Sequence, residues 1–122
     1  MPEPLILVVD DDASILETVS EILAIEGYSV ETATNGREAL DKLGRARPSL
    51  VLLDMRMPIM DGWGFAREMK ARGESVPIVV MTAAQDARRW ANEIGAAAYV
   101  PKPFEVPDLL DTVERLQPGS RS

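Results

Sequence analysis

Short, continuous runs of apolar residues recur along the chain and alternate with segments whose apolar positions have helical spacing. Runs rich in Val, Ile and Leu that do not alternate with polar residues are typical of strands buried on both faces of a sheet. The expected strands are Leu5–Val9, Tyr28–Val30, Leu50–Leu53, Val76–Met81 and Ala96–Val100.

The segments between these runs predict helices, because their apolar side chains recur at intervals of three and four residues. A first helix is expected over Ser14–Ile25, where Ser14 and Glu17 have the spacing of a capping box. Asn35 is expected to cap a second helix, with Glu38 at its third position. Three more helices are expected around Phe65–Met69, Ala87–Ile94 and Leu109–Leu116.

Strands that alternate with helices predict an α/β fold, in which a parallel sheet is covered by helices on both faces. Right-handed crossovers make this a doubly wound sheet of five strands with five helices. A chain of 122 residues has the length of one domain. We therefore expect one domain over residues 1–117 and a flexible tail over residues 118–122, with any output module on another chain or outside this sequence.

The composition narrows the possible chemistry. Apolar residues make up 46% and charged residues 27%, which suits a soluble globular protein. The net charge of −7 predicts repulsion from nucleic acid and from anionic membranes. The chain has no cysteine and no histidine, which excludes cysteine nucleophiles, Ser-His-Asp triads and His-ligated zinc. The N-terminal apolar run is short and lacks a basic region, so we expect a cytoplasmic protein without a membrane span.

Polar residues capable of chemistry follow four of the expected strands. Asp10 and Asp11 come directly after the first strand, Asp54 ends the third, Thr82 ends the fourth and Lys102 follows the fifth. The carboxyl ends of parallel strands share one edge of the sheet, which brings these residues together. Two carboxylates roughly 5 Å apart repel by about 3 kcal/mol at an effective dielectric near 20. Oxygen ligands of this kind favour Mg²⁺, with Mn²⁺ as a second possibility, and point to phosphoryl chemistry.

Each of these residue types also has a common structural explanation. An aspartate such as Asp12 after a strand is usually a helix N-cap. Thr82 alone suggests a hydroxyl bonded to backbone, and Lys102 alone suggests a solvated surface charge. Their joint placement at four strand ends is what favours a functional site.

Four motifs, in this order, resemble the receiver domain of two-component response regulators. They are LILVVDDD at the first strand, VLLDMRMPIMDG around Asp54, VVMTA at the fourth strand and YVPKPF after the fifth. The resemblance runs from Leu5 to about Leu116. It implies a flavodoxin-like sheet with strand order 2-1-3-4-5 and a switch that accepts a phosphoryl group from a histidine kinase or phosphotransfer protein. A receiver is not an enzyme in the usual sense, beyond Mg²⁺-dependent self-phosphorylation from small donors and self-dephosphorylation.

The resemblance also implies a role for each residue of the strand-end cluster. Asp54 matches the phosphoacceptor, and Asp11 matches the acid that binds Mg²⁺ directly. Asp10 matches the acid that acts through a metal-bound water. Arg56 stands where a backbone carbonyl completes the metal site, so its side chain is expected to face solvent. Lys102 matches the lysine that pairs with the phosphoryl oxygens.

Further matching positions imply a switch. Thr82 matches the hydroxyl that moves to bond the phosphoryl group, and Tyr99 matches the aromatic residue that turns inward when it does. The Lys102–Pro103 bond is expected to be cis. The surface of the fourth helix, fifth strand and fifth helix then changes and binds a downstream protein or a second copy of the chain. A short connection over Ala83–Asp86 departs from the family spacing and puts this movement in doubt.

Apolar residues near the cluster are candidates for partner docking. Ile15 and Leu16 begin the first helix, where family members dock their kinase or phosphotransfer protein, although either residue could equally belong to the core. Pro103 is a further candidate. Trp90 suggests a partner or dimer contact, with partial packing as the alternative.

Other functions fit the residues less well. A phosphohydrolase of the haloacid dehalogenase type needs a second aspartate two places after the nucleophile, and that position is Arg56. A nucleotide-binding domain needs a glycine-rich loop after the first strand, and Asp10–Ser14 contains no glycine. A degenerate receiver that acts as a constitutive interaction module stays open as the alternative.

Overall fold

The computed structural model describes residues 4–117, so the predicted tail at 118–122 lies outside the described residues. Five parallel strands form one sheet in the order β2-β1-β3-β4-β5, which confirms the predicted fold class and strand order. The strands are β1 (Leu5–Val9), β2 (Ser29–Ala33), β3 (Leu50–Asp54), β4 (Ile78–Ala83) and β5 (Ala98–Lys102). The helices are α1 (Ala13–Ile25), α2 (Gly36–Ala46), α3 (Gly62–Ala71), α4 (Ala84–Ile94) and α5 (Val106–Arg115).

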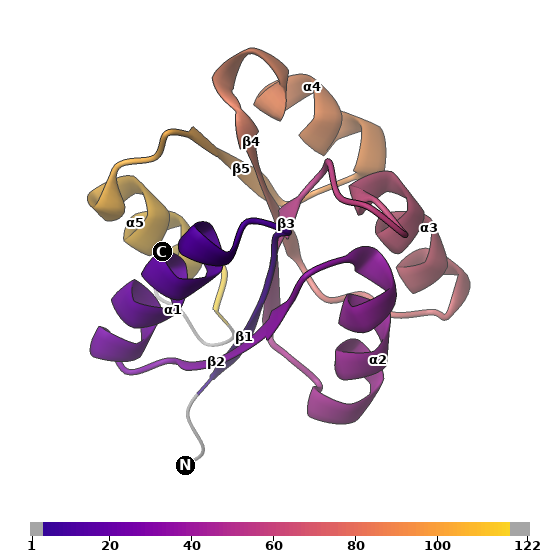
Figure 1. Ribbon diagram of the computed structural model, residues 1–122, viewed down its shortest axis with the longest axis horizontal. Helices are drawn as coiled ribbons and strands as arrows, with labels where there is room; N and C mark the ends of the chain where they lie inside the picture. The colour runs from indigo at the N-terminus through magenta and orange to yellow at the C-terminus, as the bar shows by residue number, and fades with distance from the viewer. Residues whose placement is uncertain (1–3, 118–122) are drawn as a thin grey trace.

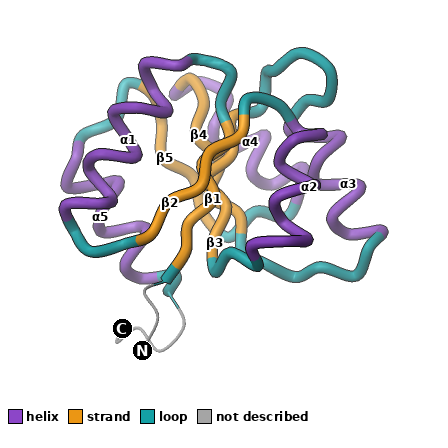
Figure 2. Tube along the Cα trace, turned by 60° about the horizontal axis from the view of Figure 1, so that its bottom comes forward, coloured by secondary structure: helices purple, strands orange, loops and turns teal. Residues whose placement is uncertain are grey.

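The helices cover the sheet on both faces (Figure 1). α1 and α5 lie together on one side of the strands, and α2 and α3 lie on the other (Figure 2); α4 shares a core with α2 and α3. Within residues 4–117, none of the helices has both the length and the apolar character that crossing a bilayer requires.

Alternate residues of the central strands supply two separate cores. Leu7, Val9 and Leu53 face the core under α2, α3 and α4. Ile6 and Val8 point the other way, into the core under α1 and α5. Because successive side chains of a strand point to opposite faces, burial on both faces requires an unbroken apolar run. This is why the uninterrupted runs in the sequence located the central strands to within two residues.

The boundaries of β4 and of both edge strands, and one helix cap, differ from the sequence prediction. β4 runs over Ile78–Ala83, two residues later at each end than the expected Val76–Met81. β2 and β5 each extend beyond the predicted run into polar positions, because a paired edge strand does not need to be apolar on both faces. The capping box predicted at Ser14 and Glu17 is wrong. The α1 N-cap is Asp12, whose side chain accepts from the backbone N–H of Ser14 at 2.9 Å. The predicted Asn35 cap of α2 is confirmed by its bond from the Glu38 N–H.

Ile59 combines exposure with an unfavourable backbone conformation. It has a φ of 70° and is 81% exposed. A left-handed conformation costs a β-branched residue about 1 to 2 kcal/mol, whereas asparagine adopts it readily. We therefore expect Ile59→Asn to raise the free energy of unfolding by about 1 kcal/mol, measured by urea denaturation.

The matched control for this prediction is Ile25→Asn. Ile25 is 82% exposed but ends a helix, so the change offers no relief of a positive φ. An equal gain in both variants would mean that reduced surface hydrophobicity, not backbone strain, accounts for the effect.

Candidate functional site

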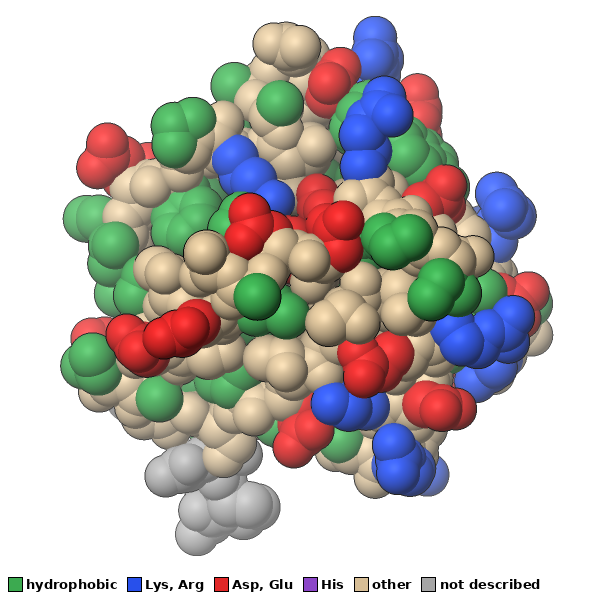
Figure 3. Space-filling model, viewed as in Figure 1, with side chains coloured by type: hydrophobic (Ala, Val, Ile, Leu, Met, Phe, Trp, Pro, Cys, Tyr) green, Lys and Arg blue, Asp and Glu red, His purple; other side chains and the backbone are tan. Residues whose placement is uncertain are grey.

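Three carboxylates meet at the carboxyl end of the sheet. One oxygen each from Asp10, Asp11 and Asp54 lies within 4.8 Å of the other two, and Asp10 and Asp54 are buried. Figure 3 shows acidic side chains gathered at the centre of the face seen in Figure 1, with a basic side chain beside them. The cluster could bind a metal ion, because its donor atoms are all hard oxygens and their mutual repulsion favours a cation between them.

Lys102 supplies the positive charge of the site. Its Nζ lies 2.7 Å from Asp10 Oδ2 and 3.7 Å from Asp54 Oδ1. The second oxygen of Asp10 accepts the backbone N–H of Asp12 at 2.9 Å, where the chain turns into α1. Asp10 is only 1% exposed, so its charge depends on these partners. The positive charge of Lys102 thus offsets the negative charges of Asp10 and Asp54, as expected from the position of these residues at the ends of parallel strands.

The environment of Asp54 disfavours its negative charge. Burial, followed by the nearby charge of Asp10, raises the pKa of the Asp54 carboxyl from 3.8 to about 6. Lys102 acts in the opposite direction and lowers this pKa, while Asp11 adds a smaller rise. A carboxylate with a raised pKa is more basic, and therefore a better nucleophile, than an exposed aspartate, while it is still largely ionised at neutral pH.

A glycine shapes the loop beside Asp54. Asp61 caps α3 through a hydrogen bond from the Gly64 N–H at 2.9 Å. A Cβ on Gly62 would lie 2.8 Å from the Met55 Cα, which is closer than real Cβ atoms come. Glycine at this position therefore lets α3 begin directly against the end of β3, and this keeps the Asp54 loop compact.

Thr82 and Tyr99, the two predicted switch residues, lie on the neighbouring strands β4 and β5. Thr82 is 6% exposed and pairs with Pro101, next to Lys102. Tyr99 on the edge strand β5 is 42% exposed, so its ring is not packed inward. The Lys102–Pro103 bond is cis, as expected. β4 ends at Ala83 and α4 begins at Ala84, so the short connection expected over residues 83–86 is reduced to a direct passage from strand to helix.

The Arg56 side chain is less free than expected. Its residue is exposed, but its guanidinium lies 5.0 Å from the centre of the Trp90 ring. Trp90 is only 6% exposed. The alternative prediction, that Trp90 packs inside the protein, is therefore confirmed, and the predicted partner contact at this residue is wrong. The Trp90 ring meets the Trp63 ring edge-on, with centres 4.9 Å apart. Sequence reasoning missed this pair; the only signal was the presence of two tryptophans in a chain poor in aromatics.

The two docking candidates on α1, Ile15 and Leu16, differ in their exposure to solvent. Leu16 is 9% exposed and belongs to the core, so it is corrected as an exposed contact. Ile15 is half-buried and lines a groove of about 570 Å³ with a largely apolar surface. The groove runs between α1 and the chain that follows β5, and its lining includes Pro103 and Phe104. It opens beside Lys102, so a partner seated there would reach the carboxylate cluster.

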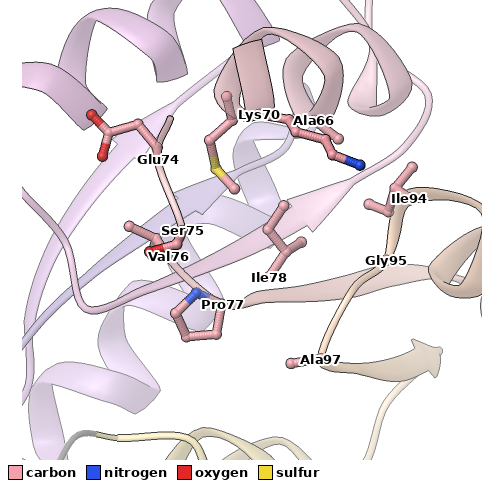
Figure 4. Close-up of a pocket in the computed structure, with 11 residues that line it drawn as sticks. Ala66, Lys70, Glu74, Ser75, Val76, Pro77, Ile78, Ile94, Gly95 and Ala97 are labelled. Carbon is pink, nitrogen blue, oxygen red and sulfur yellow. The ribbon is translucent and has the colours of Figure 1, made fainter. Parts of the chain in front are cut away.

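A second pocket lies at the opposite end of the sheet. It has a volume of about 310 Å³ and is lined by residues such as Pro77 and Ala97, which precede β4 and β5 (Figure 4). Lys70 near the end of α3 and Glu74 in the following loop also line it. Functional groups of a doubly wound sheet collect at the carboxyl ends of the strands, so this pocket is not part of the candidate site.

Comparisons with known proteins agree with the fold and with the motifs. The sequence profile of the response regulator receiver domain matches residues 6–114. The chain is 43% identical over 113 residues to the response regulator MprA of Mycolicibacterium vanbaalenii, covering 91% of this chain and 49% of that protein. The chain therefore spans about half the length of the curated relatives it matches.

Two solved structures illustrate the structural similarity. Chemotaxis protein CheY4 of Vibrio cholerae is 34% identical, with a TM-score of 0.85 over 94% of this chain and 99% of that chain. The receiver domain of NtrX from Brucella abortus is 31% identical, with a TM-score of 0.83 over 91% of this chain and 96% of that one. The resemblance in sequence and the resemblance in fold thus agree.

Proposed function

This chain belongs to the response regulator receiver domain family of two-component signalling, and on that premise we propose that it is a phosphorylation-operated switch with Asp54 as phosphoacceptor. Receiver domains are signalling switches and not classical enzymes. The observation that carries the proposal is the convergence of Asp10, Asp11 and Asp54 on one point, with Lys102 bonded to the cluster. We assign the receiver to residues 1–117.

The donor set of the site fits Mg²⁺, with Mn²⁺ as an alternative, because every side-chain donor is a carboxylate oxygen. Asp11 and Asp54 would hold the ion directly, Asp10 would hold it through water, and the backbone carbonyl of Arg56 would complete the set. When bound, the ion would neutralise the charge between the carboxylates and an incoming phosphoryl group.

Asp54 and Lys102 have different roles in the phosphoryl transfer. A carboxylate oxygen of Asp54 attacks phosphorus in line, and the new O–P bond forms as the bond from phosphorus to the donor breaks. The leaving group is the imidazole of a phosphohistidine on a kinase or phosphotransfer protein. Lys102, 3.7 Å from Asp54, is close enough to turn from the carboxylate to the phosphoryl oxygens and stabilise their charge.

The response of the chain follows from Thr82 and Tyr99. A phosphoryl group on Asp54 attracts the Thr82 hydroxyl, and the space that this frees admits the Tyr99 ring. The exposed position of Tyr99 supports this order, because the unmodified chain leaves the ring outside. The α4-β5-α5 surface changes as a result, and a downstream protein or a second copy of the chain reads the change.

The groove beside Ile15 and Pro103 is the proposed docking site for the phosphodonor protein. The groove lies between α1 and the start of α5, and both helices carry exposed acidic residues, among them Glu17 and Glu21 on α1 and Asp108 on α5. A partner with an apolar centre and a basic rim would complement this surface. The same charge argues against nucleic acid and anionic membranes as partners, and a cytoplasmic location agrees with a kinase donor.

Intact mass after incubation with acetyl phosphate tests the proposal. We expect the wild-type chain to gain one phosphoryl group only when Mg²⁺ is present, and Asp54→Asn to gain none. Asp111→Asn, an exposed aspartate on α5, is the matched control and should be modified like the wild type. Absence of the adduct in the wild type would favour the alternative, a degenerate receiver that acts as a constitutive interaction module.

A further inference from the structure

Side chains from three segments meet between α3 and α4, beside the candidate site. Trp63 at the start of α3 donates its indole N–H to Glu93 Oε1 on α4 at 2.8 Å. The Trp63 ring also meets Trp90 of α4 edge-on, with an interplanar angle of 67°. The guanidinium of Arg56, from the loop between β3 and α3, lies 5.0 Å from the centre of the Trp90 ring. These contacts connect α4 to α3 and to the loop that follows Asp54.

The connection between β4 and α4 gives this contact a mechanical consequence. Thr82 is separated from the first residue of α4 by Ala83 alone, and Ala83 itself belongs to the strand. A displacement of the Thr82 backbone towards Asp54 would be passed to the first turn of α4, because no loop lies between the strand and the helix. Trp63 and Arg56 contact α4 and would oppose that movement.

We propose that Trp63, Trp90 and Glu93 form a clasp that holds α4 in its unmodified position and opposes the response of the chain to a phosphoryl group on Asp54. This inference rests on the proposed function. Arg56 connects the clasp to the candidate phosphorylation site, because it lies two residues after Asp54 and its side chain contacts Trp90. An interaction present in only one of two conformations shifts the balance towards that conformation by its own free energy. Loosening the clasp therefore favours the modified form.

Beryllofluoride, which coordinates a carboxylate oxygen in place of a phosphoryl group, provides the test. Its affinity is measured by isothermal titration calorimetry in the presence of Mg²⁺, because calorimetry is indifferent to the loss of a tryptophan. Trp63→Phe and Glu93→Ala each remove the indole hydrogen bond, and each is expected to bind beryllofluoride roughly fivefold more tightly than the wild type. The double variant should bind no more tightly than Trp63→Phe, because both changes remove the same bond.

Arg115→Ala is the control, since it breaks an exposed pair with Asp111 on α5 and leaves α4 untouched. Its affinity should equal that of the wild type. Lower thermal stability of the clasp variants with unchanged beryllofluoride affinity would overturn the inference, because it would reduce the clasp to ordinary packing. Absence of binding by the wild type would overturn the proposed function itself, and the clasp with it.

Discussion

Lys102→Met is expected to lower the free energy of unfolding at pH 7 by about 3 kcal/mol in the absence of divalent cations. The change removes the only basic side chain within salt-bridge distance of Asp10 among the described residues, and Asp10 is 1% exposed. A buried carboxylate without its partner carries its full desolvation penalty, and the neighbouring charges of Asp11 and Asp54 add repulsion. Urea denaturation followed by circular dichroism measures the loss.

Added Mg²⁺ should restore more stability to Lys102→Met than it adds to the wild type, because the cation replaces the missing charge among the carboxylates. Arg115→Ala is the matched control, since the Arg115–Asp111 pair is exposed and such pairs contribute about 0 to 1 kcal/mol. A loss below about 1 kcal/mol in Lys102→Met would contradict the view that this lysine compensates a buried charge.

Asp54→Asn is expected to raise the free energy of unfolding at pH 7 by about 2 kcal/mol without divalent cations. The pKa of Asp54 rises from 3.8 to about 6 on folding, mainly through burial and the charge of Asp10. A shift of this size corresponds to about 3 kcal/mol of stability lost at neutral pH. The attraction to Lys102 is already included in this net shift, and partial solvent access screens the penalty, so the expected gain from asparagine is smaller than the full value of about 3 kcal/mol, at about 2 kcal/mol.

The raised pKa of Asp54 determines how the stability difference between Asp54→Asn and the wild type depends on pH. Because the folded state holds the Asp54 proton more tightly, the favourable contribution is complete below pH about 4 and is lost as the pH rises through about 6. The advantage of Asp54→Asn over the wild type should therefore appear between pH 4 and 6 and stay constant above. Asp111→Asn, an exposed aspartate, should show no such step. Parallel stability curves for Asp54→Asn and the wild type would contradict the raised pKa.

Local sequence predicted the parts of this protein that depend on local rules. The central strands were predictable because burial on both faces demands continuous apolar runs, as in Leu50–Leu53. The convergence of Asp10, Asp54 and Lys102 was predictable because all parallel strands end at one edge. The Asn35 cap was predictable because a cap uses a side chain and a backbone N–H only three residues apart.

Tertiary structure decided the features that depend on contacts between distant segments. Helical spacing did not determine whether Leu16 or Ile15 would be buried, because that depends on how α1 packs against the sheet. The stacking of Arg56 on Trp90, and the bond from Trp63 to Glu93, join residues about thirty positions apart, and no local pattern encodes them. The same holds for the pKa of Asp54. Sequence places a carboxylate at a strand end, but only the packed structure decides how much water and which charges surround it.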